Sequence, residues 1–206
     1  MKTNPSLNRS LTTLLCAATA ALLILSQPAQ AGYMVTLQQV GSNVVATGSG
    51  PIDLTGLTFL SPAGFDAGIS GFGAFIITGN GANLNSYTGF TGPTSFGSGL
   101  GVTASIFSGD GVGIAGLSGR IFVPFGYVSG AALSDSSTYN NATLSSLGVT
   151  PGIYEWTWGT GTNQNFTLDA IAPAVPDSGS TLGLLSLSVV ALLGATRLRF
   201  LQQLAA

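Results

Sequence analysis

Six carboxylates are the side chains between residues 32 and 174 that could support acid–base chemistry. They are Asp53, Asp66, Asp110, Asp135, Glu155 and Asp169. Two carboxylates facing each other in a cleft can hydrolyse a glycosidic bond. Glu155 and Asp169 fall on neighbouring predicted strands, so they are the pair that could approach each other. We prefer the simpler interpretation that both face solvent, which leaves a hydrolase as the third-ranked function.

Other kinds of catalytic and metal site are limited by composition. Residues 32–174 contain no cysteine and no histidine. This excludes Ser-His-Asp and Cys-His mechanisms, and also metal sites built on thiolate or imidazole. The segment Ser108-Gly109-Asp110-Gly111 could offer oxygen ligands to Ca²⁺, but calcium prefers several of them and only Asp110 is charged. We interpret the segment as a turn, and we expect no catalytic residue, no metal and no cofactor.

An alternating aromatic row could bind carbohydrate instead. Tyr154, Trp156 and Trp158 are spaced two residues apart, so in a strand they share one face. If exposed, the three rings could stack on sugars, which predicts a carbohydrate-binding module. If buried, they form a sandwich core with Phe166, Leu168 and Ala170 opposite them. We favour the core because aromatic side chains of this size dominate the energetics of small domains.

The chain that must position these residues has the pattern of an all-β protein. Short apolar stretches separated by Gly, Ser, Asn and Pro recur from 32 to 174, without long helical periodicity. We predict one β-sandwich-like domain of short antiparallel strands over this range. The predicted strands are 34–40 and 43–47 as a hairpin around Gly41-Ser42, 52–60, 73–78, 102–107, 120–125, 153–158 and 165–171.

Three stretches of this domain give weaker predictions. Residues 79–101 are predicted to form a long loop or an irregular hairpin. Residues 135–147 are polar, with 142–147 forming either one helical turn or a short strand. Pro124 interrupts the run 120–125, and this favours an edge strand or a strand end.

The first 31 residues have the layout of a secretory signal peptide. Lys2 and Arg9 precede an uncharged apolar stretch, and Pro28 follows it. Ala29 and Ala31 supply the small residues of a cleavage site, so Gly32 is the expected mature N-terminus.

The last residues combine a short motif, an apolar segment and a basic end. The motif spans 175–181 and opens with Val175, Pro176, Asp177, Ser178 and Gly179; Arg197 and Arg199 form the basic end at 197–199. As a helix, the run from 182 to 195 would reach about 21 Å, against a bilayer core of about 30 Å. Helix extension past 196, with both arginines snorkelling, makes a transmembrane helix feasible over about 182–196.

This three-part end of the chain, residues 175–206, resembles the PEP-CTERM class of bacterial sorting domains, in the variant that opens with Val-Pro-Asp-Ser-Gly. The resemblance implies processing by an exosortase and delivery to the cell envelope or beyond. The segments 123–130 and 152–171, the latter with its Tyr-x-Trp-x-Trp-Gly pattern at 154–159, are also similar to segments of PEP-CTERM cargo proteins. Those similarities imply a family but no chemical activity.

Charge fixes the expected orientation and excludes one class of partner. Positive residues flank the chain before the first apolar segment and after the second, and such residues stay cytoplasmic, so the domain between them is expected outside the cytoplasm. That domain has six acidic residues against Arg120 alone, which argues against nucleic-acid binding.

These observations together predict an exported, exosortase-sorted structural protein of the envelope or the extracellular, exopolysaccharide-associated matrix, without catalytic activity. The alternative is a carbohydrate-binding module acting on exopolysaccharide. The expected partners are the Sec translocon and the exosortase during export, with exopolysaccharide as a further candidate. The expected location is first an inner-membrane-anchored precursor, and then the cell envelope or the extracellular space.

Overall fold

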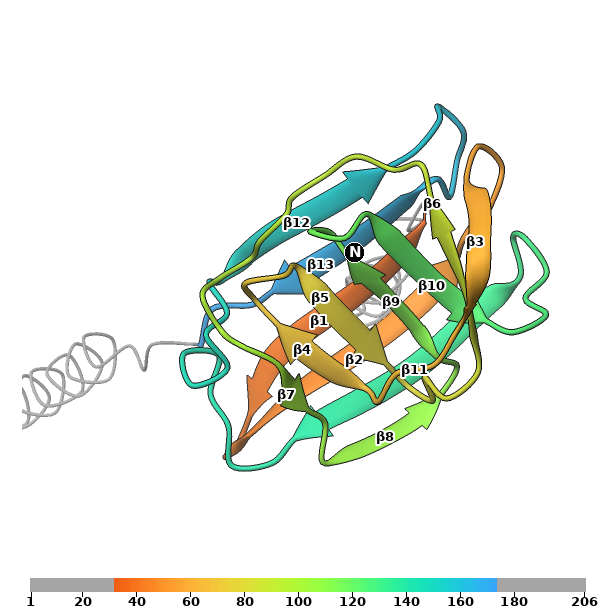
Figure 1. The fold of residues 1–206 in the computed structure, drawn as a ribbon. Coiled ribbons are helices and arrows are strands. Elements are labelled where there is room, and N and C mark those ends of the chain that lie inside the picture. Colours follow the sequence, from red (N-terminus) through yellow and green to blue (C-terminus); the bar gives the residue numbers. More distant parts are fainter. Residues whose placement is uncertain (1–31, 174–206) are drawn as a thin grey trace, which may run out of the picture. The chain divides into compact units, whose positions relative to one another are not determined.

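The computed structural model describes residues 32–173, which form two β-sheets and no helix (Figure 1). Sheet A contains, in spatial order, β12 (Gly152–Thr157), β13 (Asn165–Ala170), β1 (Tyr33–Val40), β2 (Asn43–Pro51), β11 (Ala132–Tyr139) and β8 (Ile106–Gly109). Sheet B contains β3 (Thr58–Ala63), β6 (Leu84–Thr88), β10 (Arg120–Pro124), β9 (Val112–Ala115), β5 (Phe75–Thr78), β4 (Gly68–Ser70) and β7 (Val102–Thr103). The all-β prediction is therefore confirmed. The described residues include no helix long and apolar enough to cross a membrane.

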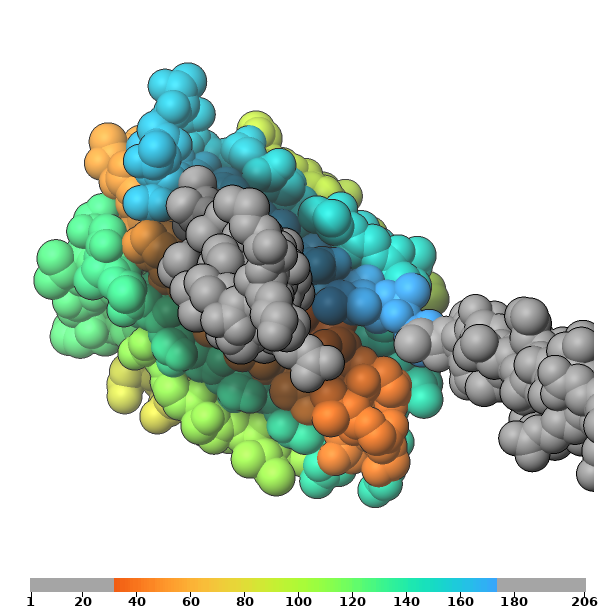
Figure 2. Space-filling view, turned by 180° about the vertical axis from the view of Figure 1, so that it is seen from behind, coloured from red at the N-terminus to blue at the C-terminus, as the bar shows by residue number. Residues whose placement is uncertain are grey.

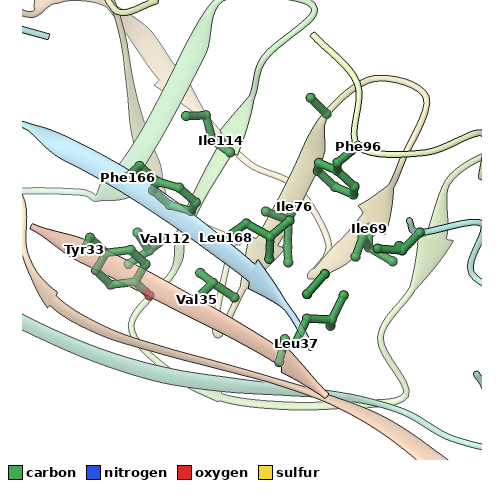
Figure 3. Packing of buried hydrophobic residues seen from close by; sticks show 14 of the residues in the cluster. Tyr33, Val35, Leu37, Ile69, Ile76, Phe96, Val112, Ile114, Phe166 and Leu168 are labelled. Carbon is green, nitrogen blue, oxygen red and sulfur yellow. The ribbon is translucent and has the colours of Figure 1, made fainter. Parts of the chain in front are cut away.

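The core lies between the two sheets, where alternate residues of facing strands meet (Figure 3). From sheet A, β1 contributes Tyr33, Val35 and Leu37, which are fully buried. From sheet B, the buried side chains include Ile76 and Ile114. The period of two arises because successive side chains of a strand point to opposite faces. Burial of each aliphatic side chain stabilises the fold by about 1.5–3 kcal/mol.

The hairpin of β1 and β2 has the predicted turn. Val40 pairs with Asn43, so Gly41 and Ser42 are the two loop residues. Gly41 has a φ of 61°, in the left-handed region that two-residue hairpin loops require. The C-terminal hairpin of β12 and β13 is also as predicted, with Trp156 opposite Phe166.

The prediction of purely antiparallel strands is wrong at the centre of sheet A. There β1 pairs with β13 in parallel, from Tyr33 beside Phe166 to Leu37 beside Ala170. These two strands come from opposite ends of the described chain, and sequence-local turn signals carry no information about such a pairing. The contact places the first and last strands side by side in the interior of the sheet (Figure 1).

The predicted strand 102–107 is wrong because its two ends belong to different sheets. β7 lies in sheet B and β8 in sheet A, and the chain crosses between them at Ala104. Ala104 is buried, and its N–H donates to the Ala67 carbonyl at 2.8 Å. The next N–H, of Ser105, already donates to Thr138 of sheet A at 2.8 Å. The alternating residue types at 102–107 are typical of one continuous strand, although the chain bends at Ala104 and Ser105.

Four strands, β4, β6, β9 and β11, were absent from the prediction, and the predicted strand 52–60 is wrong over residues 52–57, which form a turn region before β3. β6 lies within the stretch predicted as a long loop or an irregular hairpin, and β11 overlaps the stretch 135–147 only at residues 135–139. The inward residues of β11 are Leu133, Asp135, Ser137 and Tyr139. Two of these four are polar, so the strand shows no apolar alternation although it lies inside the sheet.

The structure also tests the predictions for Pro124 and for residues 142–147. Pro124 is the last residue of β10, so the strand-end interpretation holds, but β10 is an interior strand rather than an edge. Residues 142–147 form a single turn, in which the Leu147 N–H donates to the Thr143 carbonyl at 3.0 Å.

Candidate functional site

The aromatic row of β12 lies in the core. Trp156 and Trp158 are 0% and 3% exposed, and Tyr154 is partly buried against the same cluster. Trp156 packs edge-on against Phe166 with ring centroids 5.8 Å apart, and Tyr154 contacts Phe96 at 5.7 Å. These three residues therefore pack in the core, as the core interpretation expects. Neither indole ring is exposed for stacking on a sugar.

Both indole N–H groups of the row are used to hold surface segments against the hairpin. Trp156 Nε1 donates to the Pro93 carbonyl at 2.7 Å, and Trp158 Nε1 donates to the Asp53 carbonyl at 2.7 Å. Gly116 is required beside Trp156, because a Cβ at that position would lie 2.9 Å from the indole nitrogen. The two bonds join β12 to segments 63 and 105 residues away in the chain.

Asp53 is the centre of a polar network at the end of the same hairpin. Its carboxylate accepts from the Thr55 N–H at 2.9 Å, the Ser129 hydroxyl at 3.2 Å and Gln164 Nε2 at 3.2 Å. These hydrogen bonds, led by the Thr55 backbone bond, lower the pKa of Asp53. Gln164 also donates to the Thr55 carbonyl at 2.9 Å. Asp53 is thus an ionised linker between three segments, with its oxygens occupied.

The loop that joins β12 to β13 forms an open hollow of about 350 Å³. Its lining residues are Thr157, Gly159, Thr160, Gly161, Thr162, Asn163, Gln164 and Asn165. None of these residues is charged. The hollow offers hydroxyl and amide groups but no acid, base or nucleophile activated by a neighbour.

Glu155 and Asp169 are diagonal neighbours in the β12–β13 register, but the Glu155 carboxylate is bound by a different residue. Glu155 pairs in register with Thr167, while Asp169 pairs with Ile153. The Glu155 carboxylate accepts from Asn165 Nδ2 at 3.1 Å, which lies on the side away from Asp169. Asp110 accepts from the Ser134 N–H at 2.9 Å, as expected for a turn residue bonded to its neighbouring strand. Within residues 32–173, no three acidic side chains form a group that could hold a metal ion.

One pair that sequence reasoning missed is the buried contact between Tyr33 and Asp135. Asp135 is 5% exposed, and the Tyr33 hydroxyl donates to its Oδ2. Its Oδ1 has no hydrogen-bond partner among the described residues. The nearby Thr78 hydroxyl donates instead to the Val112 carbonyl at 3.2 Å. Gly48 provides the space, since a Cβ there would overlap both the tyrosine oxygen and the carboxylate.

Burial raises the pKa of Asp135 to about 6, while the Tyr33 hydrogen bond acts in the opposite direction. Burial, followed by the charge of Asp135, raises the pKa of Tyr33 well above its usual value, so the hydroxyl remains a donor at neutral pH. The pair could have been predicted from the inward position of Asp135 in β11. That position is evident only once residues 132–139 are known to form a strand. The evident effect of the pair is on stability.

The residues of the two sorting signals lie outside the described range. This applies to the cleavage-site residues Ala29 and Ala31, to the motif Val175, Pro176, Asp177, Ser178 and Gly179, and to Arg197 and Arg199. Both predicted helices, the signal helix and the one at about 182–196, fall there too.

Comparison with known proteins identifies the C-terminal segment. Residues 174–199 match the family model described as VPDSG-CTERM motif. No curated protein and no solved structure matches the chain. The resemblance to a PEP-CTERM-type sorting domain is therefore confirmed for this segment, which implies an exported protein that is processed by an exosortase.

Proposed function

We propose that this chain is a structural protein of the cell envelope or extracellular matrix, exported and sorted by an exosortase and without catalytic activity. The observation that carries the proposal is the VPDSG-CTERM match at residues 174–199. The apolar segment and the two arginines behind it anchor a precursor in the inner membrane, with residues 32–174 on the outer side.

A structural role is also supported by the carboxylates of the domain, which hold the fold together. The Asp53 network and the Asp135 pair use their carboxylates to join segments of the fold. In the aromatic row, which would have served a carbohydrate-binding module, both tryptophans are buried between the sheets and Tyr154 is partly buried. The alternative function therefore lacks the platform on which it was based, and the matrix role becomes the preferred one.

Removal of the signal peptide is expected after Ala31. The structure suits a terminus at Gly32, because the Gly32 nitrogen donates to Asn163 Oδ1 at 3.0 Å and would keep that bond as an ammonium group. Ala31→Leu, which places a bulky residue at the small-residue position, is expected to leave an uncut precursor on immunoblots. The matched variant Gln30→Leu should be cut normally. An uncut wild-type chain in the native envelope would disprove the predicted site.

Replacement of Pro176 and Asp177 by alanine is expected to block C-terminal processing. The motif would no longer present the extended, turn-forming segment that precedes the apolar run. The variant should remain membrane-bound with its full C-terminus, as measured by fractionation and mass spectrometry. Ala172→Ser, just before the motif, is the control and should be sorted normally. Unchanged mass and location in the double variant would show that the exosortase does not read these residues.

A further inference from the structure

The described sandwich has four sheet edges, and they differ in how they are protected. The edges are β12 and β8 in sheet A, and β3 and β7 in sheet B. An unprotected edge strand presents free N–H and C=O groups to other chains, so proteins usually block it with short strands, bulges, proline or charge.

Three of these edges carry such protection. β12 carries the charged Glu155, and its last residue is covered by Thr91, whose N–H and C=O exchange two hydrogen bonds of 2.9 Å with Thr157. β3 contains Pro62 and a register shift between Phe59 and Ser61. β7 has only two residues. Each of the three therefore carries at least one feature that opposes pairing with another chain.

β8 has none of these devices. Its sequence, Ile106-Phe107-Ser108-Gly109, contains no charge and no proline, and all four residues are exposed. Figure 1 shows β8 at the border of sheet A, with none of the strands of residues 32–173 beyond it, and Figure 2 shows the same yellow-green segment at the border from behind. The nearest charge, Asp110, is turned toward β11, where its carboxylate binds the Ser134 N–H.

The hydrogen-bond pattern shows which backbone groups face the open side. The Asp110 N–H donates to the Ser134 carbonyl at 3.0 Å, so the alternation of an antiparallel pair directs Ser108 toward β11 as well. Phe107 then directs its N–H and C=O away from the sheet. The outward carbonyl of Gly109 already accepts from the Asn80 N–H at 3.2 Å. Phe107 is therefore the centre of the free edge.

We propose that β8 pairs with β8 of a second copy of this chain, antiparallel and about a two-fold axis at Phe107. The two Phe107 residues would exchange both backbone hydrogen bonds and place their half-exposed rings side by side. The result is a continuous sheet across two molecules. This inference rests on the proposed structural role, for which self-association at high local concentration is useful.

The uncharged β8 edge is a place where a second copy can approach without like-charge repulsion. Residues 32–174 hold six carboxylates and a single arginine, so most approaches of one copy to another bring like charges together. The β8 edge is uncharged, and the proposed symmetry keeps the two Asp110 residues about 20 Å apart, at 3.4 Å per residue. Two four-residue strands bury less than the roughly 1,200 Å² typical of stable complexes, so we expect weak, reversible association with a Kd of about 0.1 mM.

The test is sedimentation velocity on the exported protein, purified with the termini that mass spectrometry defines. The protein concentration runs from about 10 µM to 1 mM, a range that brackets this Kd. The wild type should show a rising average mass. Ile106→Lys should weaken association at least tenfold, since edge lysines oppose strand pairing. The matched control is Ile153→Lys, on the protected edge strand β12; Ile106 is 60% exposed and Ile153 73%. Circular dichroism melts check that both variants fold.

Each outcome separates the proposal from its alternatives. A wild-type protein that stays monomeric to 1 mM, a range chosen to exceed the expected Kd, overturns it. Association that survives Ile106→Lys, or that is lost equally in Ile153→Lys, also overturns it by placing the contact elsewhere. A protein that self-associates through β8 but is not sorted by the exosortase would contradict the proposed function and leave this inference standing.

Discussion

Trp156→Ala is expected to lower the free energy of unfolding by about 3–5 kcal/mol, the usual cost of truncating a large buried aromatic residue. The indole is fully buried, packs on Phe166 and donates to the Pro93 carbonyl, so the variant loses contacts and leaves a carbonyl without its donor. Chemical denaturation monitored by circular dichroism measures the change. Ile153→Ala, on the outer face of the same strand, is the control and should change stability by less than about 0.5 kcal/mol.

The same variant separates the two functions that the aromatic row suggested. A core residue affects stability first, and any loss of glycan binding follows unfolding. If Trp156→Ala keeps wild-type stability and no longer binds native exopolysaccharide in a pull-down, the row is a sugar platform. The carbohydrate-binding module would then become the leading function.

Acidification from pH 7 to pH 4 is expected to stabilise the protein. The folded-state pKa of Asp135 is about 6, raised from 3.8, so the folded chain binds this proton more tightly than the unfolded chain does. The stabilisation is fully present below 3.8 and is lost as pH rises through about 6. At about 1.36 kcal/mol per pKa unit, the difference amounts to about 3 kcal/mol. Asp53, whose pKa is lowered, acts in the opposite direction and only at more acidic pH.

The measurement is the free energy of unfolding in urea across pH 4–7. Asp135→Asn should flatten the profile, because the amide is neutral throughout and can still accept from Tyr33. Asp110→Asn removes a carboxylate whose Oδ2 accepts from the Ser134 N–H of β11, and the slope should remain. A wild-type profile that is flat or rises with pH would show that Asp135 stays ionised in the folded state.

The elements that the sequence predicts correctly are those defined by short-range signals. Gly41-Ser42 marks the first hairpin, and Pro151-Gly152 precedes the last one, where the alternation of Tyr154, Trp156 and Trp158 identifies the buried face. Both signals lie within the segment that they predict. They need no knowledge of the rest of the fold.

The elements that the sequence does not predict depend on contacts between distant parts of the chain. The parallel contact of β1 with β13 joins residues about 130 positions apart, and the crossing at Ala104 depends on where the two sheets meet. β11 is hidden because Asp135 and Ser137 occupy inward positions, where burial normally selects apolar residues. The Asp135–Tyr33 pair was missed for the same reason, since its two members meet only after both strands are placed.

Mass spectrometry of the intact protein recovered from the native envelope and medium tests the central claim most directly. An exported, exosortase-sorted chain should begin at Gly32 and end within or close to the motif at residues 175–181, which lies inside the matched VPDSG-CTERM segment. A protein that retains both Met1 and Ala206 would contradict export and sorting together.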